Sequence, residues 1–316
     1  MIWMLLAGCL DLDVMVHNGK PCSIVGPATC EDLDNPWDRV CLTCDEEYDW
    51  AQDFDWMEGT LQDGDTVRPI PADSVARLTL PTGDGLGELD LYRLDGHGEE
   101  PATAGLTLLY NHGNYGGLEH YNPRVRLLWE LGWTIVAWDY RGYGKSLPAS
   151  PPDAAQLLSD AHQVLDWTLG DGGATPEELV LYANSLGAIP AIEMALTTPP
   201  CALLLEVPFP GLQQAQQDNT GLSLPGTFFS QGDYENTEKI KGNQAPTLIM
   251  GGDADTFFTV ADYQGLYDNT AGPRELWILP GVHHGVSDGG VPEAGMADYH
   301  QHMLDFLADQ AGGCAG

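Results

Sequence analysis

The feature that most constrains this chain is an abrupt change of pattern between residues 178 and 196. An apolar run, Leu-Val-Leu-Tyr, is typical of a buried strand, and it is followed by Ala183-Asn184-Ser185-Leu186-Gly187 and then by a helical pattern. Small residues flank Ser185, as a sharp turn from strand to helix requires, and a hydroxyl at such a corner is exposed above a helix N-terminus. The segment therefore indicates a nucleophilic serine, although a serine at this junction also serves as an N-cap.

Apolar runs alternate with helical patterns from about residue 74 onward. This alternation predicts an α/β fold, with a mostly parallel sheet covered by helices on both faces. The expected strands are residues 74–81, 88–94, 106–111, 134–140, 178–185, 202–207, 246–251 and 275–279. The expected helices are residues 123–131, 153–169, 186–198, 260–267 and 293–309, with a further short helix near 46–57.

The length of 316 residues allows one large domain preceded by an extension. We assign residues 1–9 to a short signal-like segment, residues 10–72 to an acidic, cysteine-rich N-terminal extension and residues 73–316 to the α/β domain. Leu6-Ala7-Gly8-Cys9 resembles the lipobox of bacterial lipoproteins, although the apolar stretch before it is short and the match could be accidental. The resemblance implies lipidation of Cys9, and hence an exported periplasmic or cell-surface protein attached to its membrane only through the lipid.

The remaining cysteines support export independently of the lipobox. Four of them crowd into residues 22–44, and an even number in a loop-rich segment is typical of disulfides in an exported protein. The spacing of Cys41 and Cys44 also fits a zinc site. We expect disulfides, with the four early cysteines paired among themselves. The candidates are Cys22, Cys30, Cys41, Cys44, Cys201 and Cys314.

The charge of the chain excludes several classes of partner. It carries 12 Lys and Arg against 47 Asp and Glu, a net charge of −35. Such a surface repels nucleic acids and anionic lipid headgroups, so neither is expected as a partner. The sequence has no dinucleotide-binding fingerprint and no cluster of histidines and carboxylates, so we expect no cofactor and no catalytic metal.

Polar residues follow four of the expected strands. Residues 111–117, Asn-His-Gly-Asn-Tyr-Gly-Gly, follow the third strand and Ser185 follows the fifth. Asp253 and Asp255 follow the seventh strand, and His283 and His284 follow the eighth. Since ligands bind at the carboxyl ends of the strands in such sheets, these residues are expected to meet at one edge.

The order serine, acid, histidine resembles that of the α/β-hydrolase superfamily over the region from Ser74 to the C-terminus. The segments 138–146, Trp-Asp-Tyr-Arg-Gly-Tyr-Gly-Lys-Ser, and 236–255 are also similar to that family, as is Leu-Glu-Val-Pro-Phe at 205–209. The His-Gly-Asn form of the loop after the third strand resembles the small-cap serine hydrolases, which include monoacylglycerol-lipase-like and serine-aminopeptidase-like members. Ala183 departs from the family's usual glycine before the nucleophile.

The resemblance implies a specific mechanism. Ser185 would attack a carbonyl carbon, His284 would accept its proton, and Asp255 would orient the histidine. The backbone N–H groups of Leu186 and Asn114 would form the oxyanion hole. The substrate would be a small ester, thioester or amide, uncharged or cationic. The alternatives are an inactive binding lipoprotein on the same fold and an acyltransferase.

Two of these assignments have a neighbouring competitor. Asp255 aligns with the family's acid, and Asp253 would then be a turn residue. His284 is the third residue after Gly281, the usual offset, whereas His283 would cap or pack. His112 is expected to be structural and to hold the loop that carries Asn114.

Overall fold

One eight-stranded sheet organises the protein. The computed structural model describes residues 19, 21–22, 46–52, 60–62, 65–212, 234–285, 290–309 and 314. The strands follow the spatial order β1-β2-β4-β3-β5-β6-β7-β8. They are β1 (Val75–Pro81), β2 (Glu88–Leu94), β3 (Thr107–Asn111), β4 (Thr134–Trp138), β5 (Leu179–Asn184), β6 (Ala202–Glu206), β7 (Thr247–Gly252) and β8 (Arg274–Leu279).

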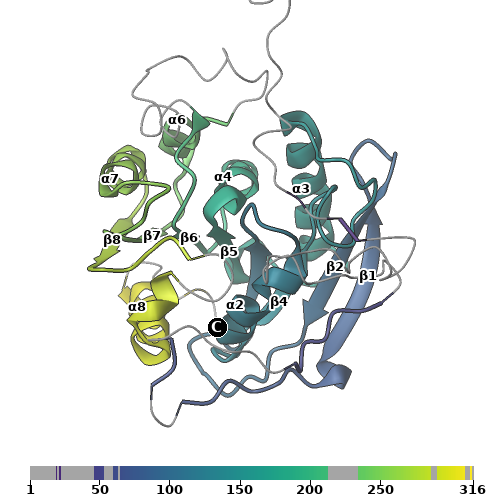
Figure 1. Ribbon diagram of the computed structural model, residues 1–316, viewed down its shortest axis with the longest axis horizontal. Coiled ribbons are helices and arrows are strands. Elements are labelled where there is room, and N and C mark those ends of the chain that lie inside the picture. Colours follow the sequence, from purple (N-terminus) through teal and green to yellow (C-terminus); the bar gives the residue numbers. More distant parts are fainter. Residues whose placement is uncertain are drawn as a thin grey trace, which may run out of the picture.

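The sheet is parallel from β4 through β8 and antiparallel only at the edge formed by β1 and β2. Every residue of β3, β5, β6 and β7 is buried, because helices cover both faces of these strands. Figure 1 shows α2 (Leu118–Trp129) and α8 (Met296–Asp309) on one face, with α3 (Ala154–Leu169), α4 (Ala188–Thr197) and α7 (Val260–Asn269) on the other. The short helix α6 spans Asn236–Lys239. The predicted fold class is confirmed.

Two helix boundaries differ from the prediction. We expected a helix over 123–131. α2 instead begins at Leu118 and holds Pro123 in its interior, because the carboxylate of Asp139 accepts the Leu118 N–H at 2.8 Å and so caps the helix. The final helix, expected over 293–309, is divided into a 3₁₀ turn (Val291–Ala294) and α8 by Gly295, whose φ is +102°.

The N-terminal extension is described only in part. Residues 46–52 form a turn at Trp50 and Ala51 rather than the start of the expected helix over 46–57, and residues 53–59 lie outside the described part. Tyr48 and Trp50 are nonetheless buried in the main hydrophobic core. These aromatic residues therefore anchor the extension to the α/β domain.

The disulfide predictions are tested at two places. Cys201 and Cys314 are bonded to each other, with their Cα atoms 5.5 Å apart. Cys22 is also disulfide-bonded. The predictions for Cys9, Cys30, Cys41 and Cys44 lie outside the described residues. Within the described part, no helix has both the length and the apolar character needed to cross a bilayer.

A buried ion pair joins α2 to the sheet. Arg124 of α2 contacts Glu206 at the end of β6, and both side chains are fully buried. The hydroxyl of Tyr182 in β5 donates to the same carboxylate, and the hydroxyl of Tyr299 in α8 lies 2.6 Å from that of Tyr182. The cluster thus connects α2 and α8 through the ends of two central strands.

Candidate active site

Ser185 sits at the sharp turn between β5 and α4. Its φ is +51°, a left-handed conformation that is costly for a residue with a side chain and persists only where the surroundings enforce it. Gly187 packs so tightly on the carbonyl of Asn111 that a Cβ there would collide with it. The Phe209 N–H donates to the Ser185 carbonyl at 3.0 Å. These contacts hold the turn and direct the serine side chain to the carboxyl edge of the sheet.

The structure brings Ser185, His284 and Asp255 together from three separate strand ends. His284 Nε2 lies 3.0 Å from the Ser185 Oγ, and His284 Nδ1 lies 2.7 Å from the Asp255 Oδ2. Asp255 is fully buried and the His284 side chain is 11% exposed, so water has limited access to the pair. The serine, the imidazole and the carboxylate therefore form one continuous chain of hydrogen bonds.

The surroundings of Asp255 favour its ionised form. Burial raises the pKa of this carboxyl, but hydrogen bonds from His284, from the Tyr263 hydroxyl and from the Phe257 N–H outweigh burial and lower it. An ionised Asp255 accepts the proton on His284 Nδ1, which leaves Nε2 as the acceptor for the serine hydroxyl. The sequence analysis did not identify Tyr263, because no motif marks its position one turn into α7.

The two competing residues lie elsewhere. Asp253 accepts the Gly281 N–H at 2.6 Å and so joins the loop after β7 to the loop after β8. The side chain of His283 is 65% exposed, with its Nδ1 3.7 Å from a carboxylate oxygen of Glu293. Asp255 and His284 are thus the acid and the histidine that the structure places in line with Ser185.

The β3–α2 loop, residues 112–117, runs beside the Ser185 turn, since β3 and β5 are neighbours with Asn111 opposite Ala183. Asn114 is half-buried in this loop, and its side-chain Oδ1 accepts the Tyr143 hydroxyl at 2.6 Å. Leu186 is buried directly after Ser185. The two residues predicted to donate to an oxyanion therefore lie on the two segments that flank the serine.

His112 is fully buried at the start of this loop. Its Nδ1 donates to the Gly113 carbonyl at 2.7 Å, its ring stacks on Tyr140 at 4.0 Å, and the Tyr140 hydroxyl donates to its carbonyl at 2.7 Å. Burial lowers the pKa of His112 to about 4, so its ring is neutral at physiological pH. These contacts agree with the structural role expected for it.

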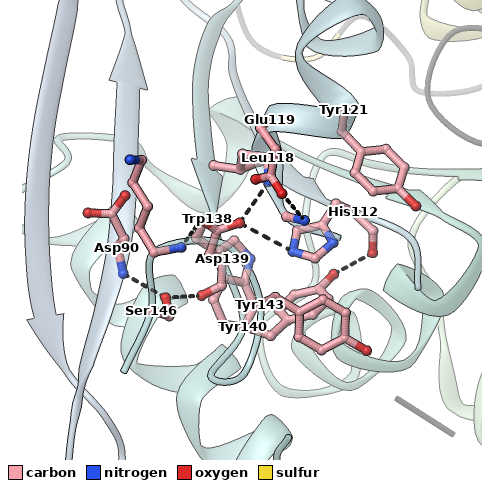
Figure 2. Close-up of polar contacts among 12 residues, drawn as sticks. Asp90, His112, Leu118, Glu119, Tyr121, Trp138, Asp139, Tyr140, Tyr143 and Ser146 are labelled. Carbon is pink, nitrogen blue, oxygen red and sulfur yellow. Dashed lines mark hydrogen bonds and ion pairs between the residues drawn. The ribbon is translucent and has the colours of Figure 1, made fainter. Parts of the chain in front are cut away.

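Asp139 lies beneath the same loop, at the end of β4 (Figure 2). It is fully buried and accepts the Tyr48 hydroxyl at 2.6 Å, the Leu118 N–H at 2.8 Å and the Lys145 N–H at 3.0 Å. Burial and the neighbouring carboxylates, Glu119 foremost, raise the pKa of Asp139 to about 7. Residues 138–146 resemble a segment of the family, but that resemblance does not predict the contacts of Asp139, because they join it to residues distant in the sequence.

Replacing Asp139 with asparagine should make stability more sensitive to acid. The pKa of His112 is about 4 when folded and 6.5 ordinarily, so His112 favours unfolding as the pH falls between these values. Asp139 has the opposite effect on stability. Its pKa is about 7 when folded and 3.8 ordinarily, so the folded state binds the proton first and Asp139 favours folding as the pH falls. In Asp139→Asn, the free energy of unfolding measured in urea should therefore fall more between about pH 6.5 and about pH 4.5 than it does in the native protein. The additional loss should be on the order of 2 kcal/mol. An equal pH dependence in both proteins would contradict this.

No group of three His, Cys, Asp or Glu side chains in the described ranges is arranged to hold a metal ion. The zinc alternative at Cys41 and Cys44 lies outside those ranges.

The chain is similar to several known proteins. Residues 103–231 match the family model described as serine aminopeptidase, S33. An uncharacterized protein of Mycobacterium tuberculosis is 29% identical over 181 residues, which cover 57% of this chain and 63% of the relative. The lysophosphatidylserine lipase ABHD12 of Macaca fascicularis is 29% identical over 195 residues, covering 55% of this chain and 48% of the lipase. The chain thus spans less than two thirds of the length of these relatives.

The solved structure of the esterase Pf2001 from Pyrococcus furiosus has the same fold. It superposes with a TM-score of 0.56 at 18% identity, covering 75% of this chain and 93% of the esterase. In this chain the serine turn follows β5, and Asp255 and His284 follow β7 and β8. These matches and the fold support placing the chain in the α/β-hydrolase superfamily.

Proposed function

We propose that this protein is a serine hydrolase that cleaves small carboxylic esters through Ser185, His284 and Asp255. The observation that carries the proposal is the unbroken hydrogen-bonded chain, 3.0 Å from hydroxyl to imidazole and 2.7 Å from imidazole to carboxylate. These distances are those that a nucleophile, a general base and an orienting acid require. The strained backbone of Ser185 adds support, because strain of this kind clusters at functional sites.

The proposed reaction has two halves. The Ser185 Oγ bonds to the carbonyl carbon while its proton moves to His284 Nε2, and the resulting oxyanion accepts hydrogen bonds from the N–H groups of Leu186 and Asn114. The bond to the alcohol then breaks, and the alcohol leaves with the proton from Nε2. Water, deprotonated by the same imidazole, releases the acid from the serine. Asp255 remains ionised throughout and stabilises the imidazolium.

Three observations favour esters of apolar, uncharged or cationic groups. Similar proteins include the esterase Pf2001 and the lysophosphatidylserine lipase ABHD12. Phe257 is 59% exposed with its ring 4.8 Å from that of His284, so an apolar surface adjoins the site. The net charge of −35 disfavours anionic substrates.

A fluorophosphonate probe should label the native protein at Ser185 and leave Ser185→Ala unlabelled. The phosphorus mimics the carbonyl carbon, and only an activated serine attacks it at a useful rate. Ser150→Ala, which alters an exposed serine, is the matched control and should be labelled as the native protein is. A series of 4-nitrophenyl esters of rising chain length would then define the acyl preference. A native protein that resists the probe and hydrolyses none of these esters would overturn the proposal.

We also propose that the protein is exported and held at a membrane surface by lipid on Cys9. The lipobox-like sequence around Cys9 supports this, and so do the disulfide between Cys201 and Cys314 and the disulfide-bonded Cys22, since such bonds persist in oxidising compartments.

A further inference from the structure

We propose that the N-terminal extension helps to position the oxyanion-binding loop, with the Tyr48 hydroxyl acting through the carboxylate of Asp139. Tyr48 would thus be a positioning residue that touches neither the substrate nor Ser185. The inference rests on the proposed function, because it assigns the β3–α2 loop, residues 112–117, a role in hydrolysis. It goes further in connecting that loop to a segment outside the α/β domain.

The extension is docked firmly at this point. The Tyr48 side chain packs on Tyr92 of β2, with ring centroids 5.2 Å apart, and the Tyr92 hydroxyl accepts the Tyr48 N–H at 3.1 Å. Asn122 of α2 donates to the carbonyl of Asp49 at 2.9 Å, and Arg126 of the same helix donates to the carbonyl of Gln52. Tyr48 is therefore fixed against both the sheet and α2, with its hydroxyl directed at Asp139.

The carboxylate of Asp139 connects this hydroxyl to the loop. Its Oδ2 accepts from Tyr48 at 2.6 Å, and its Oδ1 accepts the N–H of Leu118 at 2.8 Å. Leu118 is the first residue of α2 and directly follows the β3–α2 loop. The carboxylate thus holds one end of the loop that carries Asn114. Burial and Asp139 raise the pKa of Tyr48 well above its usual value, so its hydroxyl remains a donor.

The other end of the loop meets the same cluster. His112 Nε2 lies 3.7 Å from the Asp139 Oδ1, as Figure 2 shows, and is a buried nitrogen with no hydrogen-bond partner. The Lys145 N–H also donates to Asp139, which ties in the loop after β4, and that loop holds Asn114 through Tyr143. Rotation of the Asp139 carboxylate would therefore disturb the loop at Leu118 and, through the Lys145 and Tyr143 segment, at Asn114.

The charges around Asp139 explain why the Tyr48 hydroxyl affects the ionisation of this carboxyl group. The groups that face it are Asp90 and Tyr92 of β2, Glu119 of α2, His112, Tyr140, Lys145 and Tyr48. Burial and the two other carboxylates oppose its ionisation, whereas the Tyr48 hydroxyl and the Lys145 N–H support it. Removing the hydroxyl should therefore raise the pKa of Asp139 further, so that it binds a proton at higher pH.

Tyr48→Phe tests the proposal by removing only the oxygen. Tyr92→Phe is the matched control, because it removes a hydroxyl from the same aromatic cluster that bonds to the Tyr48 N–H and makes no hydrogen bond to Asp139. Amide hydrogen exchange should be faster over residues 112–118 in Tyr48→Phe and unchanged there in Tyr92→Phe. The kcat of Tyr48→Phe should fall about tenfold with KM within about twofold, since oxyanion stabilisation acts on the transition state. Its acidic limb of activity should move to higher pH.

A double variant separates positioning from general damage. If the hydroxyl acts through the carboxylate, Tyr48→Phe combined with Asp139→Asn should be no slower than Asp139→Asn alone. Unchanged exchange and kcat in Tyr48→Phe, equal losses in Tyr92→Phe, or fully additive losses in the double variant would each overturn the inference. If the native protein neither hydrolyses esters nor reacts with the probe, the proposed function fails, whereas the exchange comparison still decides whether Tyr48 holds the loop.

Discussion

Replacing His284 with alanine should lower kcat for ester hydrolysis by about 10⁵- to 10⁶-fold. Under the proposed function, the variant loses the base that takes the proton from the Ser185 hydroxyl, 3.0 Å away, and the acid that returns it to the leaving group. KM should change little, because the imidazole contributes mainly to the transition state. Steady-state kinetics on a 4-nitrophenyl ester, supported by burst-phase measurements, would provide the values.

The neighbouring histidine supplies the control. His283→Ala alters an adjacent imidazole that is largely exposed and points toward Glu293, so its kcat should stay within about twofold of the native value. Comparable losses in the two variants would contradict the assignment, as would substantial activity in His284→Ala. Because both changes remove the same side chain at consecutive positions, differences in folding or expression are minimised.

Replacing Glu206 with leucine should reduce the free energy of unfolding by about 3–5 kcal/mol. Glu206 and Arg124 are both fully buried, and loss of the carboxylate removes the counter-charge that Glu206 supplies to the guanidinium and the charged acceptor of the Tyr182 hydroxyl. Urea denaturation followed by tryptophan fluorescence would measure the loss.

Two comparisons make this result specific. Lys241→Met breaks an exposed pair with Glu238 and should change stability by no more than about 0.5 kcal/mol. The double variant Arg124→Met with Glu206→Leu should be more stable than Glu206→Leu alone, because no unpaired charge remains in the core. A loss in Glu206→Leu no larger than that in Lys241→Met would show that the buried pair does not stabilise the fold.

Local pattern was sufficient to predict the framework of the molecule. The central strands are short runs that burial on both faces demands, and β6 shows no polar residue before its last. Ser185, Asp255 and His284 could be found because each follows such a run, and the carboxyl ends of parallel strands meet at one edge. Choosing between Asp253 and Asp255 needed the family resemblance, since both follow β7.

Contacts between distant segments could not be predicted in the same way. The start of α2 was missed because its cap is Asp139, 21 residues beyond Leu118, rather than a neighbouring side chain. The bond from Tyr48 to Asp139 joins residues 91 positions apart, and nothing in the sequence near Tyr48 distinguishes it from a packing aromatic. Such contacts depend on how elements pack, which periodicity does not encode.

The bond between Cys201 and Cys314 closes a ring of chain that contains both Asp255 and His284 but not Ser185. A protease that cut the backbone once inside this ring would leave two pieces that remain covalently joined. Such nicked material would migrate as one intact molecule in a denaturing gel and would separate only after a thiol reductant is added.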